Sequence, residues 1–143
     1  MRRFPAPLAF ILVGLASVII ATLAGAVGAV AAVYLYDRGT SKGNDLAVSL
    51  IGFHAAGTFT FVTVFTLLWA RRGNTPWWCP IAAFAACLGL LVCDTVLNWP
   101  NYDAYYAPFF FAAWLAVAVS GGVALILSRR IQLRTARSRQ NSL

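Results

Sequence analysis

Four long apolar runs, each bounded by charged or proline-containing segments, divide this chain of 143 residues. They cover approximately residues 8–36, 46–70, 77–97 and 106–128. A helix needs about 20 consecutive apolar residues to cross the hydrocarbon core of a bilayer. Each run is long enough, so the sequence predicts an all-α integral membrane protein built as a four-transmembrane-helix bundle. We expect residues 1–128 to form this membrane domain and residues 129–143 to form a basic cytoplasmic tail.

The composition agrees with burial in lipid. Hydrophobic residues make up 61% of the chain and charged residues 10%, whereas soluble domains average roughly 45–50% and about 25%. The net charge of +7 comes from eleven Lys and Arg against four Asp and no Glu. These basic residues gather at the ends of the apolar runs, which is typical of membrane topology signals rather than of nucleic-acid binding.

The first run raises the alternative of a signal peptide, because Arg2 and Arg3 precede it. The apolar region of a signal peptide usually has about 7–15 residues. The run 8–36 is roughly twice that length, so we expect a retained spanning helix.

The distribution of Lys and Arg predicts the orientation. One side of the membrane carries nine of them and the other side carries only Arg38 and Lys42. Cytoplasmic loops hold the excess of positive charge, so both termini are expected in the cytoplasm. The amino-acid usage, which is rich in Ala, Val, Gly and Arg with a single Lys, fits a GC-rich bacterial gene. We therefore expect a protein of the bacterial inner membrane. The nine residues are Arg2, Arg3, Arg71, Arg72, Arg129, Arg130, Arg134, Arg137 and Arg139.

Small residues recur every four positions in three of the runs. Such stripes let two helix backbones approach closely within lipid. The first run carries two adjacent rows, which is wider than one contact requires. We therefore predict that Gly25 and Gly28 contact a partner protein, while the alternative is that the rows pack inside the bundle. The stripes are Ala21, Gly25, Ala29 and Ala24, Gly28, Ala32 in the first run, Gly52, Ala56, Thr60 in the second, and Ala112, Ala116, Ser120, Ala124 in the fourth.

His54, the single histidine, is predicted ~12 Å below the outer edge of the hydrocarbon, eight residues into the second run. An ionisable residue at that depth is a candidate functional residue. A structural hydrogen bond across the bundle is our preferred interpretation. A cofactor contact (a quinone, a chlorophyll or a haem) and a proton relay are the alternatives. Haem ligation by two histidines of one chain is excluded.

Asp94 lies near the outer end of the third run and is expected on one helical face with Cys87 and Cys93. It is expected several ångströms shallower than His54, so that a bond between the two would need helix tilt or a bridging water. An interfacial carboxylate is the favoured interpretation. The three cysteines, which include Cys79, match no metal or redox spacing. They are interpreted as small, buried apolar side chains.

Two further segments are candidate partner contacts. The loop between the third and fourth runs is rich in aromatic residues, which anchor protein interfaces as well as membrane boundaries. Trp99 and Tyr102 are the residues predicted to contact a partner there. In the basic tail, Arg130, Arg134 and Arg137 are expected to bind anionic lipid headgroups or the acidic face of other membrane subunits.

No combination of residues predicts catalysis, because Glu is absent and no nucleophile is paired with a base. No metal site is predicted. The leading hypothesis is a non-catalytic accessory or assembly subunit of a larger bacterial membrane complex, with a respiratory-chain complex as the first choice. The alternatives are a small protein that binds an apolar ligand or pigment (quinone, chlorophyll, haem or lipid) near His54, or a small transporter.

Overall fold

The chain folds into four long helices in the computed structural model, which describes residues 5–37, 45–71, 76–98 and 107–140. Each helix is long and apolar enough to cross a membrane. The predicted all-helical fold with four such helices is therefore confirmed, and helix bounds lie within about two residues of the predicted runs except at the end of the last helix. The helices are α1 (Ala6–Asp37), α2 (Asp45–Ala70), α3 (Cys79–Asn98) and α4 (Ala107–Gln140).

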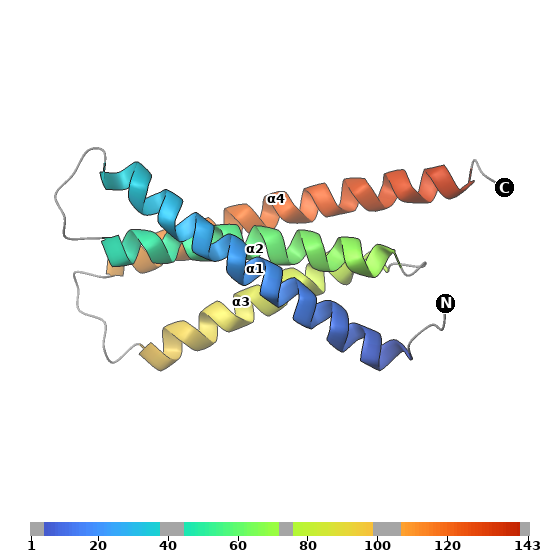
Figure 1. The fold of residues 1–143 in the computed structure, drawn as a ribbon, viewed down its shortest axis with the longest axis horizontal. Helices are drawn as coiled ribbons and strands as arrows, with labels where there is room; N and C mark the ends of the chain where they lie inside the picture. Colours follow the sequence, from blue (N-terminus) through green and yellow to red (C-terminus); the bar gives the residue numbers. More distant parts are fainter. Residues whose placement is uncertain (1–4, 38–44, 72–75, 99–106, 141–143) are drawn as a thin grey trace.

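α2 is the central helix of the bundle and packs against the other three. α1 crosses α2 obliquely and α4 runs alongside α2, whereas α3 diverges from α2 on the side away from α4 (Figure 1). Among the described helices, α1 makes close backbone contact with α2 alone. The chain enters α1 and leaves α4 at the same end of the bundle (Figure 1).

The small-residue stripes of α1 and α2 meet in a close helix contact. A β-carbon added to Gly28 would lie 2.5 Å from the β-carbon of Ala56 and 2.6 Å from the carbonyl oxygen of Gly52. One added to Gly25 would lie 2.9 Å from the ring of Phe53. Because no side chain fits at these glycines, the two backbones approach closely and gain dispersion contacts that bulkier residues would block.

The core lies where α2, α3 and α4 meet, toward the end of the bundle that holds the termini. Its buried members are Val62 and Phe65 of α2, Cys79 and Ala83 of α3, and Ala124 of α4. Nearby, the Phe84 ring occupies the place that a β-carbon of Gly121 would take. In the predicted small-residue stripe of α4, Ala124 is fully buried and the other members, Ala112, Ala116 and Ser120, are half-buried.

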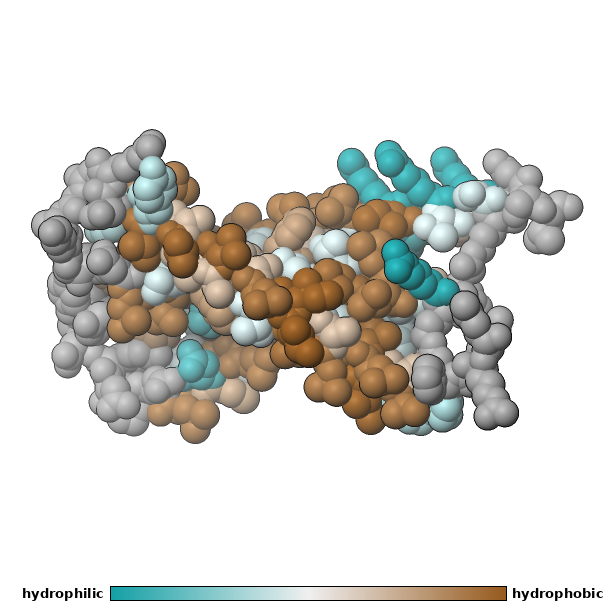
Figure 2. Space-filling model, viewed as in Figure 1, coloured by the Kyte–Doolittle hydropathy of each residue, from teal (hydrophilic) through white to brown (hydrophobic). Residues whose placement is uncertain are grey.

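Large apolar side chains cover the outside of the bundle. Leu23 and Val27 on α1, Leu90 on α3 and Phe111 on α4 are all more than 60% exposed. Figure 2 shows apolar surface around the middle of the molecule and hydrophilic side chains mainly near its ends. A continuous apolar exterior would be unstable in water, whereas it suits the hydrocarbon of a bilayer.

α4 continues well past the predicted span of 106–128 and ends at Gln140. The segment after Gly122 contains neither Gly nor Pro, and its Arg, Leu, Gln and Ala residues favour helix. Arginines near a helix C-terminus also interact favourably with the helix dipole. The twelve residues 129–140 therefore extend α4 by ~18 Å, and the tail is helical over this length.

Candidate functional site

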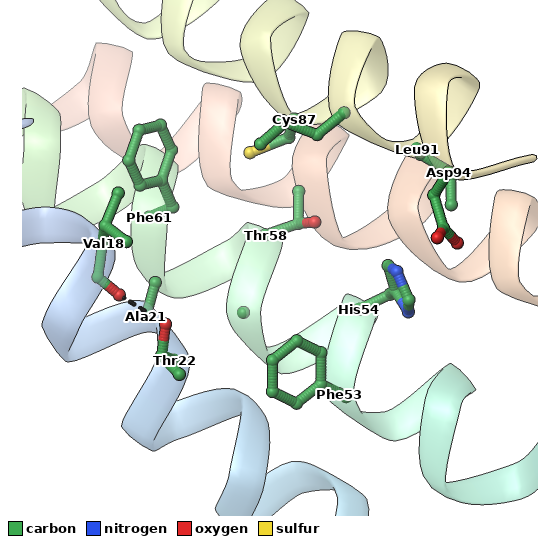
Figure 3. A pocket seen from close by; sticks show the side chains of 12 residues that line it. Val18, Ala21, Thr22, Phe53, His54, Thr58, Phe61, Cys87, Leu91 and Asp94 are labelled. Atoms are coloured by element: carbon green, nitrogen blue, oxygen red, sulfur yellow. Dashed lines mark hydrogen bonds between the residues drawn. The ribbon is translucent and has the colours of Figure 1, made fainter. Parts of the chain in front are cut away.

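A groove with a volume of about 370 Å³ lies between α1, α2 and α3. Its lining is largely apolar and includes Val18 of α1, Phe53 and Phe61 of α2, and Leu90 and Leu91 of α3. Figure 3 shows the labelled side chains that line the groove, which come from all three helices. It is the first candidate site that we consider.

The helix arrangement explains why the groove exists. α1 is held against α2 and has no close backbone contact with α3 within the described residues, so a wedge of space remains between α1 and α3. Small residues at the base of the groove leave this space unfilled, since Gly57 has no side chain and Ala21 has only a methyl group. A β-carbon on Gly57 would meet the Ala21 backbone oxygen at 3.5 Å, so α1 lies directly against α2 beneath the groove.

His54 lines the groove with one ring nitrogen already engaged. Its Nδ1 lies 2.8 Å from the backbone carbonyl oxygen of Leu50, one turn earlier in α2, so this hydrogen bond lies within the helix and not across the bundle as predicted. A carbonyl oxygen only accepts hydrogen bonds, so Nδ1 must carry the proton and donate it. In the neutral ring, Nε2 is then left with a lone pair. The ring of Phe53 packs edge-on at a centroid distance of 5.8 Å and restricts how the imidazole can turn.

Asp94 of α3 lines the same groove. Figure 3 shows its carboxylate on the side of the groove where His54 lies. No hydrogen bond joins these two side chains among the residues drawn in Figure 3. Cys87 also lines the groove whereas Cys93 does not, so the predicted common face holds for residues 87 and 94 and was wrong for Cys93. Thr58 and Thr22 add two hydroxyl groups to the lining.

The three cysteines occupy three different environments, and all are free thiols. Cys79 is buried in the core and Cys87 is half-buried in the groove, but Cys93 is exposed and does not line the groove. The interpretation of all three as buried apolar side chains was therefore wrong for Cys93, because α3 is covered by neighbours on one side only. Within the described ranges, no three His, Cys, Asp or Glu side chains come together as a metal site would require.

A second candidate site is the basic extension of α4. Arg130, Arg134 and Arg137 are exposed and lie four and three residues apart, which places them on one helix face. We call these three residues the basic ridge. On the opposite face, Ser128 is almost fully buried against the bundle. Figure 2 shows hydrophilic side chains projecting from this end of the molecule. No acidic residue follows position 106 in the sequence.

The remaining predicted contact residues are placed as follows. Gly25 and Gly28 face α2 within the chain, so intramolecular packing accounts for them, which is the alternative that the sequence left open. A partner contact of α1 stays a prediction and would have to use its exposed outer face. Trp99 and Tyr102 lie outside the described residues.

A scan against protein-family models, a search of curated proteins and a search of solved structures find no match to this chain. Chemically, the groove combines an apolar lining with the hydroxyl groups of Thr22 and Thr58 and with two further side chains that can accept a hydrogen bond, Asp94 through its carboxylate and His54 through Nε2 when its ring is neutral. The basic ridge offers guanidinium groups, which form charge-assisted hydrogen bonds with carboxylates and phosphates.

Proposed function

We propose that the chain is a multi-pass protein of the bacterial inner membrane with both termini in the cytoplasm. Four helices of spanning length, with the start of α1 and the end of α4 at one end of the bundle (Figure 1), support an even number of membrane crossings. The nine-to-two distribution of Lys and Arg supports the cytoplasmic assignment of that end.

Within the membrane, we propose that the chain is a non-catalytic subunit that docks on an acidic surface of a larger membrane complex through the basic ridge. The observation that carries this proposal is the continuation of α4 beyond the apolar span as a helix with exposed arginines on one face. A helix holds the three guanidinium groups in a fixed row, so less conformational entropy is lost on binding than with a disordered tail.

Anionic lipid is the alternative partner for these arginines. The distance of each arginine from the membrane surface distinguishes lipid binding from docking on a protein. Arg137 lies nine residues beyond Ser128, the last residue of the predicted apolar run 106–128, and this corresponds to ~13 Å along the helix. The headgroup layer on each side of a bilayer is only about 5–8 Å thick. Arg130 therefore lies within reach of headgroups, whereas an untilted α4 carries Arg134 and Arg137 past them.

We propose a respiratory-chain complex as the first partner to test, because such assemblies commonly contain small multi-helix subunits. The lack of Glu and of any nucleophile paired with a base supports the non-catalytic role.

The test is gentle detergent extraction from the native membrane, followed by identification of co-purifying subunits. We expect a defined partner at a fixed ratio, which is lost when Arg134→Glu and Arg137→Glu are combined. The matched control is Thr135→Gln with Ser138→Gln, which changes neighbouring positions of the same helix without changing charge. Unchanged recovery of the partner with the double Glu variant would refute docking through the basic ridge.

A further inference from the structure

We propose that the groove between α1, α2 and α3 binds a neutral ring that carries hydroxyl groups and an apolar tail, as a hydroquinone-type membrane lipid does. This site is independent of docking through the basic ridge. It rests on three features of the groove: the depth of its polar residues, the hydrogen-bonding polarity of those residues, and its shape.

Depth excludes an ordinary phospholipid headgroup. His54 lies eight residues from Leu46, the first apolar residue of α2, which corresponds to ~12 Å below the end of the span. Asp94 lies three residues from the end of the α3 span at Leu97, or ~4.5 Å. A charged phosphate is costly to bury at the depth of His54. A small uncharged ring can enter the hydrocarbon and place its polar atoms beside both residues.

The hydrogen-bonding groups of His54 and Asp94 favour a ligand that donates hydrogen bonds. The bond from Nδ1 to the Leu50 carbonyl leaves Nε2 of neutral His54 as an acceptor. The carboxylate of Asp94 accepts as well, and its roughly four lone-pair positions allow a ligand bond beside any other partner. A ring with two hydroxyl groups can donate to both residues. The oxidised quinone presents only carbonyl acceptors at the same positions, so it lacks these two bonds.

The shape of the groove favours a single ring over a larger pigment. A volume of about 370 Å³ is near the lower limit of ligand pockets, which span roughly 300–1,000 Å³. Phe53 and Phe61 offer aromatic surfaces to a flat ring. An apolar tail can leave between α1 and α3, which have no close backbone contact in the described structure. A tetrapyrrole macrocycle is several times larger than one ring and would have to displace the lining side chains.

The experiment compares two probes on the purified full-length chain in lipid nanodiscs, under anaerobic conditions that keep the first probe reduced. The probes are a long-chain alkylhydroquinone and its dimethyl ether, which has the same ring and tail but no donor. We expect the ether to bind at least about tenfold more weakly, because two hydrogen bonds are lost. Equal dissociation constants would overturn the proposal, and this comparison needs no variant.

Variants then locate the site. His54→Leu and Asp94→Leu should each weaken binding of the alkylhydroquinone and reduce the difference between the two probes. The control is Ser49→Ala, because the Ser49 hydroxyl bonds only to the Leu46 carbonyl. This variant should change neither the affinity for the alkylhydroquinone nor the difference between the probes. Thermal unfolding should verify that each variant is folded. Folded His54 and Asp94 variants that keep full affinity would contradict this location. A visible absorption band of the purified chain that disappears in His54→Leu would overturn the proposal in favour of a tetrapyrrole.

Discussion

The carbonyl oxygens of Gly28 and Gly52 each lie so close to the other residue that a β-carbon there would clash with them. The backbones of α1 and α2 therefore touch at this point without intervening side chains. The contact fixes the position of α1 on α2, and since α1 forms one wall of the groove, it also determines how wide the groove is. These two glycines thus connect the packing of the bundle to the candidate ligand site.

The first prediction concerns this contact. Gly28→Leu should lower the free energy of unfolding of the isolated chain by roughly 1–3 kcal/mol or more, because the side chain must push the helices apart. Gly14→Leu is the matched control in the same helix, since a β-carbon on Gly14 meets no atom within 4 Å. Thermal unfolding in detergent, followed by circular dichroism, measures both.

The same measurement decides between the two interpretations of the stripe on α1. If Gly25→Leu combined with Gly28→Leu destabilises the chain on its own, the stripe packs inside the bundle, as the structure has it. A double variant that unfolds like the parent chain but no longer co-purifies with a partner would instead assign these glycines to an external contact.

The second prediction concerns Gly121 and Phe84, which join α4 to α3. Gly121→Ala should destabilise the bundle, because its methyl group would occupy the place of the Phe84 ring. Phe84→Leu should relieve much of this cost when combined with Gly121→Ala, giving a favourable coupling energy in a double-mutant cycle. Additive effects of the two changes would show that the ring and the glycine are not in contact. Gly122→Ala is the control, since space around Gly122 is open.

The third prediction concerns the hydrogen bond between α3 and α4. Trp114 Nε1–H donates to Thr95 Oγ1 at 3.2 Å, and Thr95 Oγ1 in turn donates to the Leu91 carbonyl oxygen at 2.7 Å. Thr95→Val should lower stability by about 0.6–1.7 kcal/mol, the range of interhelical hydrogen bonds in membranes. Thr22→Val is the control, because the Thr22 hydroxyl bonds only within its own helix. A loss of stability no larger than that of Thr22→Val would contradict the role of the bond.

Much of the architecture follows from run length and residue size alone. Apolar runs of spanning length predicted all four helices, and the small residues of α1 and α2 predicted a close contact between helices. The sequence could not decide which surface the stripe of α1 meets, because the spacing of Gly25 and Gly28 suits a helix of the same chain as well as a helix of a partner. That choice depends on how α1 crosses α2.

Residues of the candidate site could be predicted from the sequence, but the groove that brings them together could not. Depth identified His54 and helical periodicity placed Cys87 and Asp94 on one face, but the groove arises because α1 and α3 stay apart. Nothing in the local sequence of either helix encodes that separation. The helical extension of α4 was missed because its arginines suggested a polar tail, although its residues have high helix propensity.

The most direct test of the account is a topology map of the intact chain in the bacterial membrane, because docking through the basic ridge requires the end of α4 to be cytoplasmic. Reporter domains that are active only outside or only inside the cytoplasm are fused after Lys42, Arg72, Asn101 and Leu143. The account predicts external signals at Lys42 and Asn101 and cytoplasmic signals at Arg72 and Leu143. A cytoplasmic signal at Lys42 or Asn101, or an external signal at Leu143, would contradict it.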